Sequence, residues 1–230
     1  MIRMFLVFLL LAPMPALAQS FTPPAGCTGW LTVQARACRV SNFYTCTQDK
    51  AGDQWRTDFD QQGLFFASRV DAEGQWVESI ELNPSTRQTL SPVPNDPASF
   101  SELLSGLDTF DFGLQKDDGT ASKVRGFDRL TGQTVVIDGV SLSETEFEFS
   151  ETDLDGNLLR QSRGREYIHP DWRLFFAGPS EWDGGEGYVP LDGSPLQFVF
   201  PGEAGFFSSQ PLFECDAVLS RFTPEVSHGN

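Results

Sequence analysis

The dipeptide Asp155-Gly156 constrains the fold more than any other feature, because it lies between two stretches that have the composition of β-strands. Asp-Gly is a strong signal for a two-residue β-hairpin turn, in which both turn residues need a positive φ angle. With this turn, residues that face each other on the two strands have numbers that add to 311, starting with Leu154 opposite Asn157. The dipeptide therefore predicts an antiparallel hairpin with a fixed register.

The predicted register brings three acidic residues opposite three arginines. The pairs are Glu151 with Arg160, Glu148 with Arg163, and Glu146 with Arg165. Directly opposed charges stabilise an antiparallel sheet by about 0.2–1 kcal/mol per pair, and by less where the pair is exposed. Because side chains alternate between the two sides of a strand, we expect the second and third pairs to line one solvent-facing side.

The other side of this hairpin carries large aromatic rings across from small residues. Phe147 faces Gly164, and Phe149 faces Ser162. Large rings opposite small residues indicate that a second layer covers the rings or that a groove lies there. We therefore expect these four residues to form the ligand face, if the protein binds a ligand in this region.

The remaining sequence predicts a mainly β protein. Gly52, Gly63 and Gly74 are equally spaced, and an aromatic residue follows each of them within a few positions. Strand-like stretches separated by turn residues at intervals of about 8–12 residues are typical of all-β domains. We predict an antiparallel, strongly twisted meander sheet, in the form of a half-barrel or open barrel, with one or two short helices.

Residues 97–106 are the best helix candidate, because Asp96 can act as the N-cap and Pro97 suits the first helical position. Residues 28–46 favour a short helix or an irregular start followed by a strand. Residues 178–195 are rich in Gly, Pro and acidic residues, which predicts a long surface loop. The helix and this loop would act as a plug and a lid for the sheet.

The stretch 140–149 has two conflicting alternations. Val140 and Leu142 point to one side of a regular strand, whereas Phe147 and Phe149 point to the other. One regular strand cannot turn both apolar sets toward the core. We therefore predict a bulge or bend near residues 143–145.

The first residues have the features of a secretory signal peptide. Arg3 precedes an apolar run, and the sequence Ala16-Leu17-Ala18 fits a cleavage site. We expect residues 1–18 to be the signal peptide and residues 19–230 to form a single β-rich domain that does not span a membrane after cleavage. The protein would then be periplasmic or secreted.

The chain contains four cysteines, which is an even number and favours two disulfides in an exported protein. Three connectivities are possible. We favour a local Cys38–Cys46 bridge together with a Cys27–Cys215 bridge that joins the N-terminal and C-terminal segments. The spacing of the four residues does not fit a zinc site.

Charge and motifs narrow the function classes. The net charge of −16 disfavours nucleic acid and broad binding to anionic lipid. His169 lies beside Pro170 and the chain lacks a G-x-S-x-G elbow, which disfavours Ser-His-Asp catalysis. We expect no catalytic residue, no cofactor and no metal. A carboxylate-based hydrolase stays a less favoured alternative, since the sequence does not indicate which acids would pair.

The 21 phenylalanines and five tryptophans form either a solid core or a binding surface. They recur with a period of two, usually beside Gly or Ser, which suits a curved sheet whose concave face binds something apolar. We favour a non-enzymatic periplasmic protein that binds or carries an apolar or amphiphilic ligand. The alternative is a cell-envelope interaction or structural protein with a solid core, whose partner is an envelope protein.

Residues 127–147, 164–178 and 196–206 resemble uncharacterised exported proteins of alphaproteobacteria. The resemblance covers most of the chain after the signal peptide and implies a periplasmic location, but it brings no activity with it. A meander with covering helices is also similar to the half-barrel of periplasmic lipoprotein and lipid carriers. That second similarity concerns the fold alone and gives no residue a role.

Overall fold

The computed structural model describes residues 19–82 and 84–215. The expected signal peptide, residues 1–18, lies outside the described part of the chain. The protein is mainly β, with 61% of the structure in strands, as the sequence predicts. Within the described residues, no helix is long and apolar enough to cross a membrane.

The strands form one antiparallel meander sheet in which neighbours in sequence are usually neighbours in space. Over the described residues, the strands are β1 (Cys27–Ala35), β2 (Arg39–Cys46), β3 (Gln54–Asp60), β4 (Gly63–Val70), β5 (Trp76–Leu82), β6 (Ser85–Leu90), β7 (Leu107–Lys116), β8 (Ala121–Ile137), β9 (Val140–Asp153), β10 (Leu158–His169), β11 (Leu174–Asp183), β12 (Val189–Asp192) and β13 (Pro195–Val199). A short helix, α1 (Phe100–Leu103), lies between β6 and β7. The last strand departs from the meander, because β13 pairs with β1.

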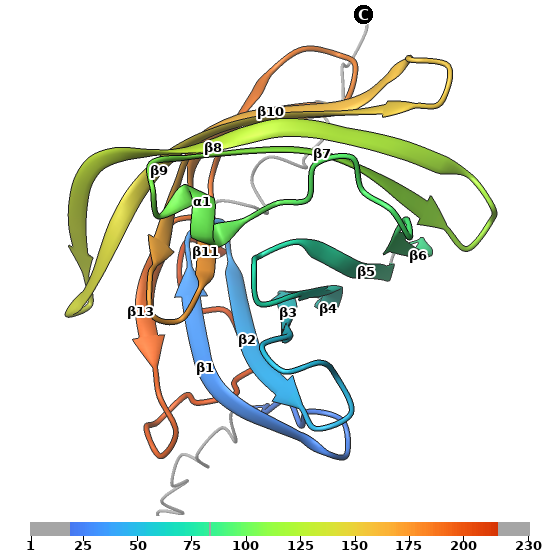
Figure 1. The fold of residues 1–230 in the computed structure, drawn as a ribbon. Coiled ribbons are helices and arrows are strands. Elements are labelled where there is room, and N and C mark those ends of the chain that lie inside the picture. Colours follow the sequence, from blue (N-terminus) through green and yellow to red (C-terminus); the bar gives the residue numbers. More distant parts are fainter. Residues whose placement is uncertain (1–18, 83, 216–230) are drawn as a thin grey trace, which may run out of the picture.

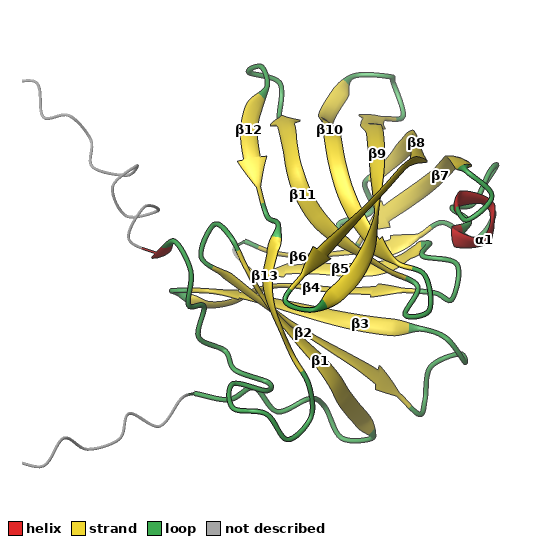
Figure 2. Cartoon of the chain, turned by 90° about the vertical axis from the view of Figure 1, so that its left-hand side faces the viewer, coloured by secondary structure: helices red, strands yellow, loops and turns green. Residues whose placement is uncertain are grey.

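The sheet curls into an open barrel. Its strand order begins with β12 at one edge, runs back through the meander to β1 and ends with β13 at the other edge. Residues 193–194 join β12 to β13, so the two edges approach each other although the sheet is not closed. The long strands β8, β9 and β10 arch over β1 to β5 (Figure 1), and a second view shows β12 and β13 on one side (Figure 2). The concave face is therefore directed inward.

The hairpin of β9 and β10 has the predicted register. From Arg160 to Ile168, facing residues of the two strands have numbers that add to 311. A bulge between Leu158 and Arg160 precedes this regular part. The prediction is confirmed for every charged pair of the hairpin, because all three pairs lie within the regular part.

The turn of this hairpin differs from the predicted one. It contains three residues, 154–156, because the Asp153 N–H donates to the Asn157 carbonyl oxygen at 2.9 Å. Gly156 has a φ of +91°, whereas Asp155 does not have a positive φ. The expected facing pair of Leu154 and Asn157 is therefore wrong. A three-residue loop with glycine in the left-handed position replaces the two-residue turn, and the bulge corrects the register.

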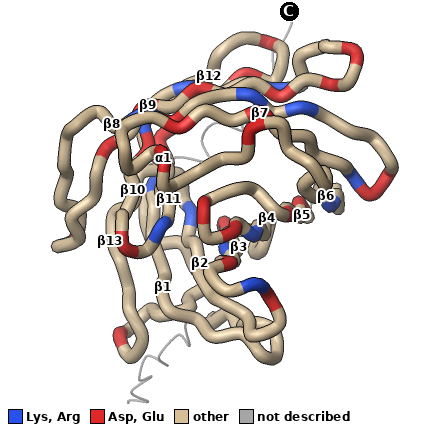
Figure 3. The backbone as a smooth tube through the Cα atoms, in the orientation of Figure 1, with Lys and Arg blue, Asp and Glu red and all other residues tan. Residues whose placement is uncertain are grey.

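The charged side of the hairpin faces solvent, as predicted, but its ion pairs differ in part. The ion pairs on this side are Arg163–Glu181 at 2.8 Å, Arg165–Glu144 at 2.7 Å and Arg129–Glu146 at 2.7 Å. The predicted pair Arg160–Glu151, at 2.6 Å, is present but lies on the other side of the hairpin, with Glu151 buried. Arg163 and Arg165 reach a carboxylate on an adjacent strand or on a diagonal. Long side chains can span these diagonal distances. Acidic and basic positions accordingly lie close together along these strands (Figure 3).

Helix α1 is shorter than the predicted helix over residues 97–106. Ser99 is its N-cap and accepts a hydrogen bond from the Glu102 N–H at 3.2 Å. Asp96 cannot start the helix, because its backbone exchanges hydrogen bonds of 2.9 and 2.8 Å with Asp111 of β7. The side chains of Phe100 and Leu103 are buried, at 1% and 0% exposure, so the helix still packs on the sheet as expected.

Two other local expectations are wrong. Residues 28–35 lie in β1 rather than in a short helix, because β2 and β13 both pair with that segment. Residues 178–195 do not form a long loop, since β11 continues to Asp183 and β12 covers Val189–Asp192. This part of the chain forms an edge of the sheet and not a lid.

The irregularity predicted near residues 143–145 is present, although the extra residues lie in the opposite strand. Pairing between β8 and β9 jumps from Leu130 opposite Thr145 to Thr134 opposite Ser143. β8 therefore has three unpaired residues where β9 has one. This allows the inward-facing set of β9 to change along its length.

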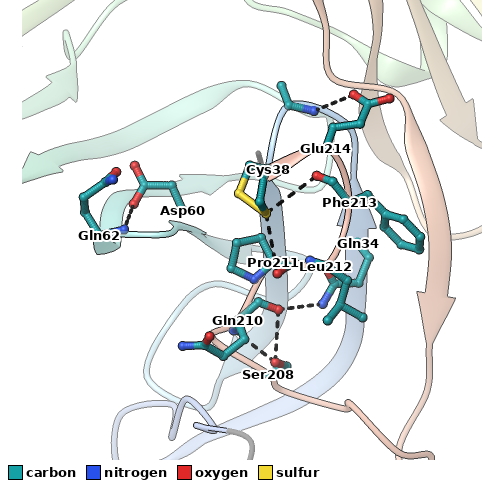
Figure 4. Close-up of a disulfide and its surroundings, with 12 residues drawn as sticks. Gln34, Cys38, Asp60, Gln62, Ser208, Gln210, Pro211, Leu212, Phe213 and Glu214 are labelled. Atoms are coloured by element: carbon teal, nitrogen blue, oxygen red, sulfur yellow. Dashed lines mark hydrogen bonds between the residues drawn. A yellow bond between two sulfur atoms is a disulfide. The ribbon is translucent and has the colours of Figure 1, made fainter. Parts of the chain in front are cut away.

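The disulfides are Cys27–Cys46 and Cys38–Cys215, so the favoured connectivity is wrong. The β1–β2 hairpin places Cys27 directly opposite Cys46. Cys38 lies in the turn of that hairpin, and β2 separates it from Cys46 by roughly 25 Å at about 3.3 Å per residue. The C-terminal segment reaches Cys38 instead, whose N–H donates to the Phe213 carbonyl oxygen at 3.1 Å (Figure 4). Two disulfides indicate an oxidising, non-cytoplasmic environment.

Candidate ligand-binding cavity

The inner face of the curled sheet is covered by several apolar clusters and not by one continuous core. The buried apolar residues of the described chain form three clusters, which contain Phe43, Phe112 and Phe100 respectively. A cavity of about 360 Å³ lies where the clusters meet, because members or packed neighbours of all three line it. Ligand pockets of proteins range from about 300 to 1,000 Å³, so this cavity can hold one small molecule.

The alternation of β7 builds one wall of the cavity. Asp108, Phe110, Phe112 and Leu114 are buried, whereas the residues between them are more exposed. All four side chains line the cavity. An acidic residue, Asp108, therefore lies in the same inward-facing row as three apolar residues. It is at the start of β7, close to α1.

Gly126 of β8 allows two aromatic rings to meet in the wall. It faces Phe110 of β7 on one side and Phe149 of β9 on the other. A Cβ atom at this position would lie 2.2 Å from the Glu148 carbonyl oxygen and 2.8 Å from the Phe110 ring. Phe149 in turn contacts Trp76 edge-on, with 5.5 Å between ring centroids. A side chain at position 126 would therefore disturb the strands and the aromatic wall.

Four arginines of the wall are each held by a carboxylate and an aromatic ring. The ion pairs are Arg56–Asp58 at 3.2 Å, Arg69–Asp53 at 2.7 Å, Arg160–Glu151 at 2.6 Å and Arg173–Glu73 at 2.7 Å. The rings beneath the guanidinium groups belong to Phe66, Trp55, Trp76 and Phe100, at 4.9–6.0 Å. These arginines are therefore largely neutralised within the protein.

Glu151 illustrates how strongly such a pair is held. Burial alone would raise the pKa of this carboxyl, but Arg160 and hydrogen bonds from Ser122, Arg160 and Gln88 hold it below its ordinary value. The Ser122 hydroxyl donates at 2.6 Å and the Gln88 amide at 3.1 Å. Glu151 is therefore a structural anion that joins β6, β8, β9 and β10.

Three other carboxyl groups of the wall are not held in this way. Among the described residues, Asp108, Asp128 and Glu166 form no ion pair with a basic side chain. Asp108 is only 3% exposed, and its Oδ2 accepts a hydrogen bond from the Ser99 N–H at 3.1 Å. Its Oδ1 is buried and lacks a hydrogen-bond partner among the described residues. A buried acceptor without a partner costs about 1–3 kcal/mol.

The surroundings of these carboxyls favour their protonated forms. Burial raises the pKa of Asp108 to about 6, although the Ser99 N–H opposes the change. Burial and the neighbouring Asp108 raise the pKa of Asp128 to about 7. Burial and Asp128 raise the pKa of Glu166 to about 8, against the opposing effect of Arg56. At neutral pH the group therefore retains at least one proton and can both donate and accept hydrogen bonds.

The structure places the residues of the expected ligand face in two different settings. Phe147 and Phe149 line the cavity, with their rings stacked at 6.3 Å between centroids. Ser162 is buried and donates to a backbone carbonyl of β11 at 2.9 Å. Gly164 lies against Ser180 of β11, because a Cβ atom there would lie 2.5 Å from the Ser180 Cα. The two small residues therefore allow β11 to approach, and the two rings face the cavity.

Sequence reasoning missed the carboxyl groups of the cavity. A signal for Asp108 was present, since it has the same alternation as Phe110 and Phe112. Glu166 likewise has the same alternation in the predicted hairpin as Ser162 and Gly164. An acidic residue in an inward-facing row is unusual, because buried carboxylates are costly unless they are paired. The alternation within a single strand does not show which strands pair, so it could not predict that these acids lie together.

The wall of the cavity is amphiphilic. Aromatic rings supply an apolar wall, and neutral carboxyls and paired arginines supply polar groups. No group of three or more His, Cys, Asp or Glu side chains in the described ranges is arranged to hold a metal ion. Comparison of the chain with protein-family models, with curated proteins and with solved structures found no match. Function is therefore inferred from the cavity itself.

Proposed function

We propose that the protein is a non-enzymatic periplasmic binding or carrier protein, which holds one apolar or amphiphilic small molecule inside its curled sheet. The observation that carries this proposal is the cavity of about 360 Å³ between the apolar clusters. Phe43, Phe110 and Phe112 line this space and do not fill it. The fact that the clusters leave this space supports a binding role.

The periplasmic location is the finer part of the proposal. The two disulfides indicate an oxidising compartment. The signal-like sequence of residues 1–18 and the resemblance to exported bacterial proteins favour the periplasm among such compartments. The net charge of −16 suits a protein that avoids adsorption to anionic membrane surfaces while it carries its ligand.

A cell-envelope interaction protein with a solid core is the alternative. The cavity favours the carrier over this alternative, because a solid core would leave no space of that size. The carboxyls with raised pKa values favour a second candidate, a carboxylate-based hydrolase in which one acid is protonated and another ionised at neutral pH. Hydrolysis of 4-nitrophenyl glycosides that is lost in Glu166→Gln would favour this hydrolase.

Binding of a neutral fluorescent probe tests the carrier proposal. N-phenyl-1-naphthylamine should bind the wild type with a blue-shifted, enhanced emission. Ser68→Phe places a ring in the cavity wall and should weaken binding at least tenfold. Ser141→Phe adds the same ring at an exposed position of β9 outside the cavity and should bind as the wild type does. Equal binding by both variants, or an absence of binding to the wild type, would contradict the proposal.

A further inference from the structure

We propose that the cavity selects amphiphiles whose polar end is a protonated amine, which binds among the carboxyl groups of Asp108, Asp128 and Glu166. The inference rests on the proposed binding function and adds the charge class of the ligand. It also gives the ligand an orientation, with the cation at these acids and the apolar part along the phenylalanines.

Strand pairing brings the three acids to one region of the inner face. Asp108 of β7 lies directly opposite Asp128 of β8, and Asp128 lies opposite Phe147 of β9. Phe147 in turn faces Gly164 of β10, two residues before Glu166. The three side chains line the same cavity, and the acids on β7 and β10 flank the one on β8.

One carboxyl oxygen of this group has no hydrogen-bond partner. Asp108 is 97% buried, yet its Oδ1 has no hydrogen-bond partner in the described structure. Native proteins rarely leave a buried acceptor in this state. Because this oxygen has almost no accessible surface, the Asp108 side chain would have to rotate to present it to the N–H donor of a ligand in the cavity that Asp108 lines.

The charge balance of the wall favours a cation over an anion. Arg69 lies near Asp49, Asp53 and Glu78, and each of the other three ring-stacked arginines has its own carboxylate. Arg56 is the basic side chain that acts on Glu166, but it already lies 3.2 Å from Asp58. Arg39 also lines the cavity, over the Phe65 ring at 5.5 Å, and has no ion pair among the described residues. A cation therefore finds three acids without a basic partner, whereas an anion finds one such arginine.

The groups around the acids add negative rather than positive charge. Glu102, Asp96 and Glu73 act on Asp108 from α1 and the loops beside it, and the Ser99 N–H is the opposing donor. Burial, together with repulsion from the neighbouring acid, raises the pKa of Asp128 and of Glu166 and so keeps protons on them, although Arg56 opposes this at Glu166. A bound cation would favour the ionised carboxylates, so binding at neutral pH should release protons to the buffer.

Aromatic rings beside the acids suit the same ligand. Phe147 lies directly opposite Asp128 on the neighbouring strand. Phe110 lies two residues after Asp108 on the same side of β7. Ammonium groups are attracted to the faces of aromatic rings, and sites of acids and rings recognise organic cations. The apolar tail would then continue toward Phe149 and Trp76, which contact each other edge-on in the wall.

Three ligands of equal chain length, decylamine, decanol and decanoate, test the inference at pH 7. Binding is measured by calorimetry and by quenching of Trp55 and Trp76, which line the cavity. Decylamine should bind at least tenfold more tightly than decanol, and decanoate more weakly than both. Calorimetry in two buffers of different ionisation enthalpy should show proton release with decylamine and none with decanol.

The triple variant Asp108→Asn, Asp128→Asn, Glu166→Gln should lose the preference for decylamine and still bind decanol. Should it fail to fold, Asp128→Asn and Glu166→Gln separately should each reduce the preference severalfold. Glu148→Gln, on the exposed side of β9, should keep the wild-type preference. Equal binding of the three ligands, or tightest binding of decanoate, would overturn the inference and leave the carrier function intact. If none of the three binds to the wild type, the proposed function fails as well.

Discussion

Glu166→Gln should stabilise the protein at alkaline pH. The pKa of Glu166 is raised from 4.5 to about 8 by burial and by Asp128, so the folded state holds a proton that the unfolded chain has already released. A carboxyl with a raised pKa stabilises the fold fully below its unfolded pKa. That contribution is lost as the pH rises from about 4.5 to about 8. Glutamine keeps the shape and polarity of the protonated acid but cannot ionise.

The magnitude follows from the two pKa values. The difference between about 8 and 4.5, at about 1.36 kcal/mol for each pKa unit, sets an upper bound of about 5 kcal/mol. Water in the cavity screens part of this cost, so we expect an advantage of about 2–4 kcal/mol for Glu166→Gln at pH 9. At pH 4.5 the advantage should be close to zero, because both side chains are then neutral in the folded state.

Urea unfolding at pH 4.5, 6, 7.5 and 9 measures this advantage. The difference in free energy of unfolding between Glu166→Gln and the wild type should increase steadily with pH. Glu148→Gln provides the matched control, since this glutamate is exposed on the adjacent strand, and its difference should stay nearly constant. Parallel pH profiles for Glu166→Gln and the wild type would refute the conclusion that folded Glu166 is protonated at neutral pH.

Three further outcomes are expected. Replacing Cys38 and Cys215 by serine should cost about 2–5 kcal/mol of unfolding free energy, because this disulfide closes a loop across a sequence separation of 177 residues. A peptide map under non-reducing conditions should recover the Cys27–Cys46 and Cys38–Cys215 disulfides. A Cys38–Cys46 peptide would contradict the fold of the first hairpin. Gly126→Ala should cost about 1–3 kcal/mol in urea unfolding, because the new methyl group meets backbone, whereas Gly113→Ala meets a serine hydroxyl and should cost less; equal costs would contradict the close approach of strands. Glu151→Gln should lower the free energy of unfolding by about 3 kcal/mol at pH 7. Because the pKa of Glu151 is lowered in the folded protein, this loss should be present in full above about pH 4.5 and shrink as the pH falls. A loss that does not depend on pH would argue against a buried ion pair.

Local patterns of the sequence determined much of the fold. The register of β9 and β10 follows from an Asp-Gly turn and from alternation, and both signals are contained within one hairpin. The turn length was wrong, because a three-residue loop with a compensating bulge gives the same register as a two-residue turn. The mistaken helix start at Asp96 has a similar origin, since local capping signals do not include the competing hydrogen bonds of Asp111.

Features that depend on distant parts of the chain could not be predicted. The disulfides depend on β1 being a strand and on the C-terminal segment returning to Cys38. The cavity depends on how far the sheet curls and on how the three apolar clusters pack around it. Phe147 and Phe149 were expected on the ligand face from their alternation, and they line the cavity. The acids beside them come from three strands, whose approach is fixed by the whole sheet.

Native mass spectrometry of the protein isolated from its source cells tests the carrier function most directly. The wild type should retain a bound molecule of low mass that dissociates under activation or on denaturation. Ser68→Phe, isolated in the same way, should lack this mass, whereas Ser141→Phe should retain it. A wild-type protein that carries no bound mass in repeated preparations would contradict the carrier function and favour a partner on the outer surface.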